Sequence, residues 1–271
     1  RASIKGWVGK GTIPINVYAF NLSPSGTGKG HSTSIIEEEV INQFREVFTE
    51  HTFPLIAESN LEKLANRRAA RNSTDPSDEL EKIRKDFNSL GSLMFSFDSA
   101  TSPAIKQMRQ KLLMASSGAC NLQVDEIGAN FSASIEPLTT YLELFDKGMV
   151  KDKLVKSTQE NVRFEKITGA TPANCLLFGS PSKLLDGSTT ENQLMEMLEM
   201  GYARRCFFGY ARKPTKVRHL SADEVLDQWY DSANDAFMEQ LSDKLGLLAD
   251  MVNVNKEILI PQDSIKYLIE Y

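Results

Sequence analysis

Apolar positions along the chain follow two spacings, one typical of strands and one of helices. Residues 15–22 are β-prone and end at a turn signal, whereas from about 30 to 48 apolar side chains recur every three or four residues. The same patterns predict further strands at 92–97, 119–125, 174–179, 205–210 and 257–260, and helices at 57–71, 77–90, about 103–115, 190–200, about 221–248 and the C-terminus. Ser102 and Pro103 are predicted to begin their helix as N-cap and first turn. Strands alternating with helices predict an α/β fold with a mostly parallel central sheet.

The pattern also predicts how the chain is organised. Pro54 is predicted to end the first long helix, because proline has no backbone N–H to continue the ladder. The two helices that follow make a helical insert over about 50–90. We expect one domain, with its core over about 14–212 and a helical and strand extension over 213–271. Because the chain begins at Arg1 rather than at methionine, we also expect it to be a fragment of a longer protein.

The composition is that of an ordinary globular protein, with 41% hydrophobic and 25% charged residues among 271. This apolar content is enough for a sizeable core without disulfides or a structural metal. The net charge of −5 excludes a protein that is basic throughout, so a contact with nucleic acid must come from a local patch. Two basic clusters are candidates: Lys147, Lys151, Lys153 and Lys156, and Arg212, Lys213, Lys216 and Arg218.

The three cysteines lie far apart and form no CxxC pair. Such a set is typical of a reducing cytosol, with each cysteine serving as a small core hydrophobe. The three histidines make no ligand spacing with them, so a metal cluster is not expected. No apolar run approaches the roughly 20 residues that a membrane span needs, and no signal peptide is visible. These features predict a cytoplasmic protein without a membrane partner.

Residues 23–30 read Ser-Pro-Ser-Gly-Thr-Gly-Lys-Gly and lie between a predicted strand and a predicted helix. This is the context of a Walker A loop, GxxxxGK[ST], which holds the phosphates of a nucleotide. Gly26 and Gly28 allow backbone N–H groups to converge on a phosphate, and the helix start adds its positive dipole end. Lys29 is predicted to bridge the β- and γ-phosphates of ATP.

The loop departs from the Walker A pattern at two positions. Ser23 stands in place of the first glycine, and Gly30 stands in place of the Ser or Thr whose hydroxyl normally binds Mg²⁺. Ser32 lies about 200° round a helix from Gly30 and is a poor substitute. The alternative interpretation is a glycine turn in front of a helix, with Lys29 merely solvated.

The strand predicted at 119–125 leads into an acidic pair, Asp125 and Glu126. A carboxylate at the C-terminal end of a parallel strand faces the phosphate loop. We expect Asp125 to hold Mg²⁺, directly or through water, and Glu126 to polarise the attacking water. The alternative is a solvated turn. Asn121 and Gln123 are unusual in a strand buried on both faces, so we expect polar groups to cover part of one face.

Three further side chains are candidates for the site. Ser180 follows the strand at 174–179, where a small polar group can sense the γ-phosphate or the water; the alternative is a plain turn serine. Arg204 and Arg205 stand at the entrance of a hydrophobic strand and point to opposite sides. We expect one of them to serve the phosphates, most readily those of a neighbouring subunit; the alternative is two ordinary ion pairs. By sequence, Lys29 is the only cation near its own loop.

Five segments in the same order resemble one family. They are residues 25–31, 97–101, 121–128, 178–182 and 201–205. Over roughly residues 14–212 the set resembles the motor domain of phage and prophage primase–helicase proteins, which is of the RecA-like, hexameric-helicase type. In RecA-like motors an acid at the end of the second strand can be the general base, so Asp98 is the second candidate for that role.

The resemblance implies an ATP- and Mg²⁺-dependent motor that assembles as a ring of identical subunits, possibly a hexamer, on single-stranded or duplex DNA. A phage-encoded motor would work in the cytoplasm of its bacterial host. The implied nucleotide contacts are Ser25, Gly26, Thr27, Gly28, Lys29, Gly30 and His31. Three alternatives stay open: an ATPase switch such as a loader or packaging accessory, a small-molecule P-loop kinase, and a degenerate nucleotide-binding scaffold. The kinase should carry an arginine-bearing lid, and no convincing one is visible.

Overall fold

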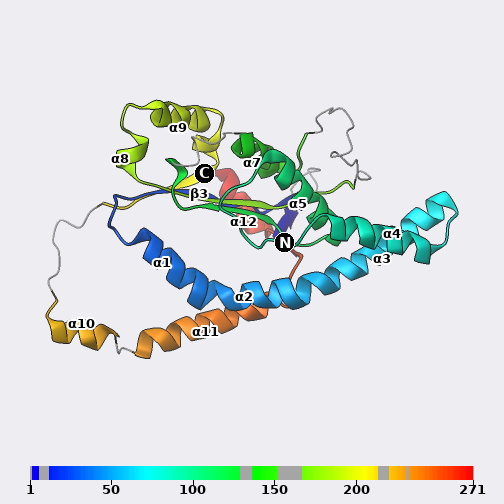
Figure 1. Cartoon of the computed structure of the whole chain (residues 1–271), viewed down its shortest axis with the longest axis horizontal. Coiled ribbons are helices and arrows are strands. Elements are labelled where there is room, and N and C mark those ends of the chain that lie inside the picture. The colour runs from blue at the N-terminus through cyan, green and yellow to red at the C-terminus, as the bar shows by residue number, and fades with distance from the viewer. Residues whose placement is uncertain are drawn as a thin grey trace.

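A four-stranded parallel sheet forms the centre of the molecule (Figure 1). The computed structural model describes residues 2–5, 12–128, 136–151, 167–212, 220–229 and 232–270. In the order β4-β5-β3-β6, the strands are Cys120–Val124, Ala173–Gly179, Tyr18–Leu22 and Cys206–Tyr210. Helices cover both faces of the sheet, so the predicted α/β architecture is confirmed and is compatible with a RecA-like fold.

Strands β3, β4 and β5 bury every second side chain on one face of the sheet. On β4, Cys120, Leu122 and Val124 are buried, and β3 contributes Tyr18 and Phe20 to the same core. Helices α5 (Ser102–Ala115) and α7 (Glu136–Lys147) pack over this face. As predicted, the cysteines are free thiols; two are fully buried and the third is partly buried.

The opposite face of the sheet carries amides, as the two unusual polar positions of β4 predicted. Asn121 Nδ2 donates to the Phe95 carbonyl at 2.7 Å, and its Oδ1 accepts from Asn174 Nδ2 on β5 at 2.9 Å. Gln123 donates to the carboxylate of Glu37. These bonds satisfy polar groups that would otherwise be costly to bury beside the sheet.

A continuous helical rod runs along this amide-bearing face. It consists of α1 (Lys29–Ile35), the π-helical η1 (Ile36–Ile41), α2 (Asn42–Glu46), the π-helical η2 (Val47–Thr52) and α3 (Phe53–Asn72). The predicted helix end at Pro54 is therefore wrong. The η2 segment stops just before Pro54, which then occupies the first turn of α3, where a missing N–H leaves no helix bond unmade.

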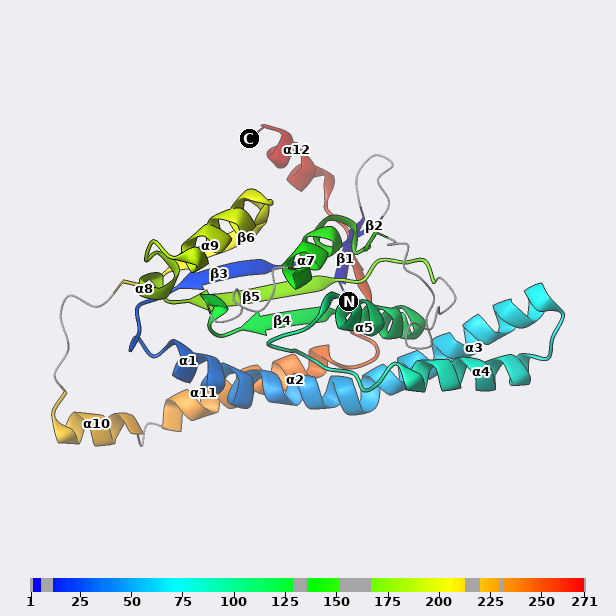
Figure 2. The same ribbon diagram turned by 45° about the horizontal axis from the view of Figure 1, so that its top comes forward.

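The predicted insert is a helical hairpin that projects beyond the sheet (Figure 2). Helix α3 ends at Ser73 in the left-handed conformation, and α4 (Pro76–Ser89) returns antiparallel beside it. Asp75 caps α4 by accepting from the Ser77 backbone N–H at 2.7 Å. A small second core of Leu61, Ala65 and Ile83 joins the two helices.

The second predicted strand, 92–97, does not form. Only Phe97 makes a bridge, to Leu122 of β4, while the Asn121 side chain takes the Phe95 carbonyl that a strand ladder would use. The helix after it starts as predicted at Ser102, but its cap is Thr101, whose Oγ1 accepts from the Ala104 N–H at 3.4 Å.

The remaining elements complete the two sides of the sheet. After β5 come α8 (Pro181–Leu184), α9 (Thr189–Glu199) and η3 (Tyr202–Arg204). The helix predicted over 221–248 is present as α10 (Ala222–Trp229) and α11 (Ser232–Leu248), and residues 230–231 lie outside the described residues. Helix α11 packs along η1 and α2. The structure also has a small sheet in the order β2-β1-β7 (Thr12–Pro14, Ala2–Lys5, Lys256–Ile258) and the helix α12 (Gln262–Glu270).

In the part of the chain that the structure describes, every helix is too short or too polar to cross a membrane.

Candidate functional site

The loop between β3 and α1 turns sharply at two glycines. Gly26 and Gly28 adopt φ values of +78° and +82°, in the left-handed region that glycine enters without strain. Thr27 Oγ1 donates to the Pro24 carbonyl at 2.9 Å and closes the turn on itself. The Ser23 N–H donates to the Gly179 carbonyl at 3.1 Å, which fixes the loop to the end of β5. The predicted strand–loop–helix context is thus present.

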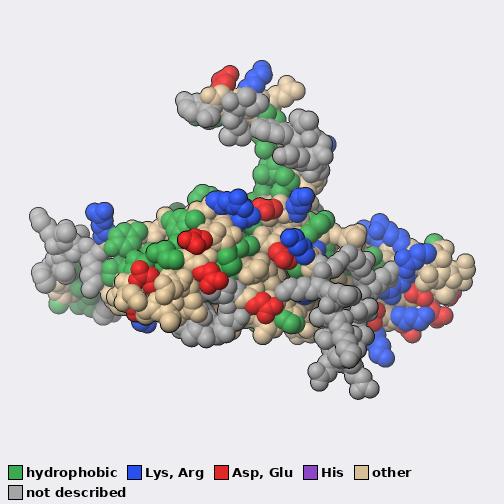
Figure 3. All heavy atoms as spheres, turned by 90° about the horizontal axis from the view of Figure 1, so that it is seen from above, with side chains coloured by type: hydrophobic (Ala, Val, Ile, Leu, Met, Phe, Trp, Pro, Cys, Tyr) green, Lys and Arg blue, Asp and Glu red, His purple; other side chains and the backbone are tan. Residues whose placement is uncertain are grey.

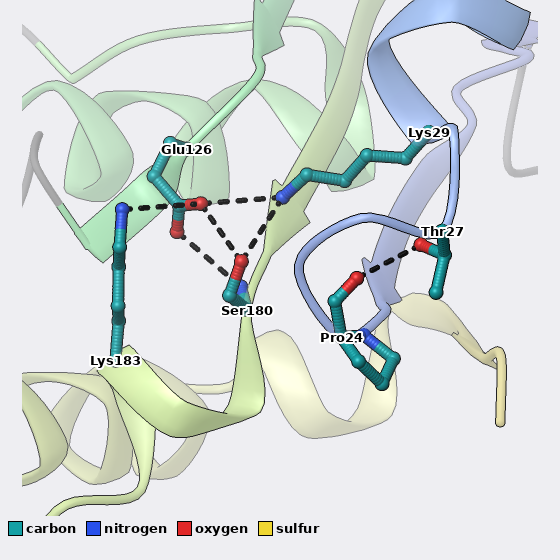
Figure 4. A network of polar contacts seen from close by, with 6 residues as sticks. All are labelled: Pro24, Thr27, Lys29, Glu126, Ser180 and Lys183. Atoms are coloured by element: carbon teal, nitrogen blue, oxygen red, sulfur yellow. Dashed lines mark hydrogen bonds and ion pairs between the residues drawn. The ribbon is translucent and has the colours of Figure 1, made fainter. Parts of the chain in front are cut away.

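Lys29, the first residue of α1, reaches across the end of the sheet to two side chains (Figure 4). Its Nζ lies 3.2 Å from Glu126 Oε2 and 3.4 Å from Ser180 Oγ. Ser180 in turn donates twice to the same carboxylate, from Oγ to Oε2 at 3.0 Å and from its backbone N–H to Oε1 at 3.3 Å. We call these three residues the Lys29–Glu126–Ser180 cluster.

The sheet topology explains why these three residues meet. Strand β5 lies between β3 and β4, and all three run parallel, so their carboxyl ends share one edge. Lys29 follows β3, Glu126 follows β4 and Ser180 follows β5 directly. Ligands of open α/β sheets bind at this edge. Sequence reasoning placed each residue after a strand, and the structure brings all three together.

The carboxylate of Glu126 is held in its charged form. Partial burial alone would raise its pKa, but hydrogen bonds from Lys29 and Ser180 outweigh burial and hold the pKa of Glu126 below its usual range. The side chains of Lys29 and Glu126 are each 25% exposed, so water and ligands still reach the pair. A carboxylate that is charged, oriented and accessible can accept a proton from a bound water.

Lys183 is a second cation at the site, and sequence reasoning missed it. Its Nζ lies 3.9 Å from Glu126 Oε2, and its side chain is 62% exposed (Figure 4). Lys183 belongs to the short helix α8, which starts directly after Ser180. The expectation that Lys29 is the only cation near the loop is therefore wrong. The signal was present in the sequence, because a lysine three residues beyond a strand-end serine stays at the same sheet edge.

The other loop residues and Asp125 surround the cluster without entering it. Ser25, Gly30 and His31 are exposed on the loop and the first turn of α1. Asp125 is exposed on the bend after β4, whereas its neighbour Glu126 turns toward Lys29. Of the acidic pair, the structure thus brings Glu126 to the phosphate loop and leaves Asp125 at the solvent side.

The oxygen ligands here fit Mg²⁺ in part. Mg²⁺ binds through one or two carboxylates together with water and substrate phosphates, and the exposed Asp125 supplies one carboxylate at this end of the sheet. Gly30, which stands where a Walker A loop has a Ser or Thr, supplies no hydroxyl ligand. Among the described residues, no group of three or more His, Cys, Asp and Glu side chains lies close enough together to hold a metal ion.

Asp98, the second candidate base, has its hydrogen bond with a neighbouring residue and not with the cluster. The strand that was expected to carry it is reduced to the single bridge at Phe97. The Asp98 side chain is exposed and accepts a hydrogen bond from the neighbouring Ser99 hydroxyl at 3.3 Å. Its position one residue beyond the bridge keeps it on the same side of the molecule as the end of β4.

The two arginines lie at the opposite end of the sheet. Both precede β6, which runs parallel to β3, so they stand at the amino ends of the strands. Arg205 pairs with Asp146 of α7 (Nη2 to Oδ2, 2.8 Å) and donates from Nη1 to the Gly201 carbonyl at 3.2 Å. For Arg205 the structure therefore supports an ordinary ion pair. Arg204 is exposed.

The two basic clusters are only partly within the described residues. Lys147, Lys151 and Arg212 are exposed. Lys153, Lys156, Lys213, Lys216 and Arg218 lie outside the described residues. On the face seen in Figure 3, basic and acidic side chains are interspersed, which agrees with the small negative net charge.

No protein-family model matches the chain, and neither the curated proteins nor the solved structures contain a match.

Proposed function

We propose that this chain is the ATP-hydrolysing motor domain of a phage-type replicative DNA helicase. The observation that carries the proposal is the Lys29–Glu126–Ser180 cluster at the carboxyl edge of a parallel sheet, directly beside a glycine loop and a helix start. A lysine, a carboxylate and a hydroxyl in this arrangement suit phosphoryl transfer to water, which depends mainly on positioning and charge stabilisation.

Phosphate binding is the role of the loop and of Lys29. Backbone N–H groups at the start of α1 and around Gly26 and Gly28 attract the phosphate oxygens. Lys29 exchanges part of its contact with Glu126 for the β- and γ-phosphates, because an ammonium on a flexible stem can rotate between two anions. The exposed Lys183 supplies a second positive charge at the same edge.

Hydrolysis then uses Glu126 as the base. Its carboxylate orients a water toward the γ-phosphorus and takes the proton as the new P–O bond forms and the bond to the ADP oxygen breaks. Ser180 keeps the carboxylate in place through its two hydrogen bonds. Asp125 is the residue that would hold Mg²⁺, directly or through water, and the ion when bound would neutralise charge on the phosphates.

Motor action and DNA are supported by the resemblance to phage primase–helicase motors, and by the segments that carry it. Three of these segments contribute the cluster: 25–31, 121–128 and 178–182. Such motors form rings, in which Arg204 would act on the nucleotide of a neighbouring subunit. DNA would meet a local basic patch, for which the exposed Lys147, Lys151 and Arg212 are the described candidates.

An ATPase assay with and without single-stranded DNA tests the proposal. The wild-type chain should hydrolyse ATP, and single-stranded DNA should raise its turnover. Lys29→Ala should lower turnover at least about 10²–10³-fold, because it removes a charge-assisted phosphate contact from the transition state. Lys85→Ala, an exposed lysine on α4, is the matched control and should keep wild-type turnover.

The outcomes separate the candidate functions. Hydrolysis that DNA does not stimulate indicates an ATPase switch rather than a translocating motor. ATP consumption only in the presence of a small-molecule phosphate acceptor indicates a kinase, and nucleotide binding without turnover indicates a scaffold. Unchanged turnover in the Lys29→Ala variant would overturn the phosphate-loop assignment itself.

A further inference from the structure

A cleft of about 480 Å³ lies on the amide-bearing face of the sheet, away from the Lys29–Glu126–Ser180 cluster. Its walls come from the helical rod, from the segment that fails to form a strand at 92–97, and from the amino ends of β4 and β5. Its volume falls in the range of small-molecule sites, about 300–1,000 Å³.

The cleft walls are mostly aromatic and aliphatic. Phe44 and Phe48 of the rod stack with ring centroids 6.0 Å apart, and Phe95 meets Phe44 edge-on at 5.9 Å. Met94, which is 51% exposed, stands at the cleft beside Phe95. Flat rings gain most from such walls, because aromatic pairs favour stacked and edge-to-face contacts.

Two carboxamides give the cleft a polar wall with unused bonding capacity. Asn121 spends one N–H on the Phe95 carbonyl and one lone pair on Asn174. Asn174 spends one lone pair on the Val17 N–H at 3.0 Å and one N–H on Asn121. A carboxamide has two N–H donors and two acceptor sites, so with respect to the described residues each amide keeps one donor and one acceptor.

The charges around the cleft select against a charged ligand. Glu37 and Arg45 are its two charged lining residues, and they are of opposite sign. Glu37 already accepts from Gln123, and Arg45 donates to Asn42. Apart from the hydroxyl of Ser96, the side chains of the remaining lining are apolar or amide, and burying a net charge against such a surface is costly.

The cleft is a site separate from the phosphate edge. Asn121 pairs with Asn174 near the amino ends of their strands, whereas Glu126 and Ser180 follow the carboxyl ends. Glu37 is eight residues beyond Lys29 on the helical rod, roughly 12 Å along its axis. A ligand in the cleft therefore contacts the rod that begins at Lys29 without touching the phosphates.

We propose that this cleft binds an uncharged, flat ring system that carries an N–H donor next to a carbonyl acceptor, a lactam or ring carboxamide. The aromatic walls take the ring faces, and the spare donor and acceptor of Asn121 and Asn174 take the lactam edge. The ligand binds at this cleft independently of the Lys29–Glu126–Ser180 cluster.

Titration calorimetry with 2-quinolone, a neutral bicyclic lactam, tests the inference. The expected dissociation constant is about 0.1–1 mM, the affinity of a small and otherwise unoptimised ligand. N-methyl-2-quinolone lacks the N–H donor, so it should bind at least about tenfold more weakly, because polar groups of the cleft are left unpaired.

Variants locate the binding. Met94→Trp fills the cleft and should weaken 2-quinolone binding at least about tenfold, whereas Met149→Trp should leave it unchanged. Met149 is the matched control, because it is 49% exposed and does not line the cleft. Lys29→Ala should bind 2-quinolone like the wild type, which separates this result from the fate of the proposed ATPase activity.

Absence of binding up to the solubility limit of 2-quinolone overturns the inference. Equal affinity of the Met94→Trp and wild-type chains for 2-quinolone would show that the ligand binds outside this cleft. Equal affinity for the two quinolones overturns the recognition of a lactam edge by the amides.

Discussion

Two ion pairs stand at opposite ends of the same parallel sheet and differ in how firmly they are held. At the carboxyl ends of the strands, Lys29 and Glu126 lie 3.2 Å apart and are each 25% exposed. At the amino ends, Arg205 and Asp146 lie 2.8 Å apart, with the arginine 10% exposed and the aspartate 60% exposed. The Lys29–Glu126 pair can open, whereas the Arg205–Asp146 pair holds the start of β6 against α7.

The chemistry of the two cations explains the difference. The ammonium of Lys29 is a compact charge on a flexible stem, and its two bonds go to side chains, Glu126 and Ser180. The planar guanidinium of Arg205 also binds the main-chain carbonyl of Gly201 and lies 5.5 Å from the ring of Phe145. Lys29 is thus free to exchange a side-chain partner for a ligand, as its proposed role requires, whereas Arg205 joins the start of β6 to α7 and the main chain.

The largest expected effect concerns Arg204, the exposed neighbour of Arg205. Arg204→Ala should lower ATP turnover about 10³-fold or more, because an arginine supplied in trans stabilises charge on the γ-phosphate. Arg204 lies at the amino end of β6, about 16 Å by the length of that strand from the carboxyl edge of its own sheet, so the proposed role is on a neighbour's nucleotide. Arg67→Ala, an exposed arginine on α3, should leave turnover unchanged.

A mixing experiment sharpens this prediction. Chains with Lys29→Ala and chains with Arg204→Ala are each inactive alone, and their mixture should recover part of the activity. Mixed rings that form but stay inactive would contradict the role in trans.

The next effect compares the two candidate bases. Glu126→Gln should slow single-turnover hydrolysis about 10²–10⁴-fold and keep ATP binding, because an amide cannot accept the proton of the water. Asp98→Asn should stay near the wild-type rate, since the Asp98 carboxylate is exposed and bonded to Ser99, whereas Glu126 is held by Lys29 and Ser180. A large loss in Asp98→Asn with a wild-type rate in Glu126→Gln would move the base to Asp98.

Arg205→Ala should change stability rather than chemistry. Loss of the bonds to Asp146 and Gly201 should lower the free energy of unfolding by about 1–2 kcal/mol, measured by urea denaturation. Arg204→Ala is the matched control and should unfold like the wild type. Turnover per folded Arg205→Ala chain should be unchanged, and a large loss there would give Arg205 a direct role in catalysis.

The smallest effect is a shift of the pH profile in Ser180→Ala. The hydroxyl of Ser180 helps to hold the pKa of Glu126 below its usual range, so its removal should raise that pKa. Glu126 then loses its charge at a higher pH, and the acid limb of the ATPase profile should move upward by less than about one unit. An acid limb that stays in place would show that Ser180 does not tune Glu126.

Sequence reasoning found the parts of the fold and site that depend on strand order. Lys29, Glu126 and Ser180 each follow a strong strand pattern, and parallel strands end at one edge, so their meeting was predictable. The polar residues Asn121 and Gln123 also predicted that one face of the sheet carries polar groups, and the structure has amides there.

Features decided by tertiary contacts were not predictable in the same way. The β-prone segment 92–97 does not pair with β4 as a strand, because the Asn121 side chain, and not a backbone N–H, donates to the Phe95 carbonyl. The rod is not broken at Pro54, because the π-helical segment η2 ends at Thr52 and Pro54 lies in the first turn of α3. The short strands β1 and β2 carry too few residues for a readable alternation, and Lys183 reaches the site from a helix of one turn.

The unbroken helical rod from Lys29 to Asn72 also has a mechanical consequence. At about 1.5 Å per residue it is roughly 60 Å long; its first half packs on α11, and α3 packs on α5 and α4. A tilt of about five degrees at the loop end of such a rod would displace its far tip by about 5 Å. If the loop binds a phosphate as proposed, the tip of the α3–α4 hairpin is where a small rearrangement around that phosphate would become a movement large enough to reach another molecule.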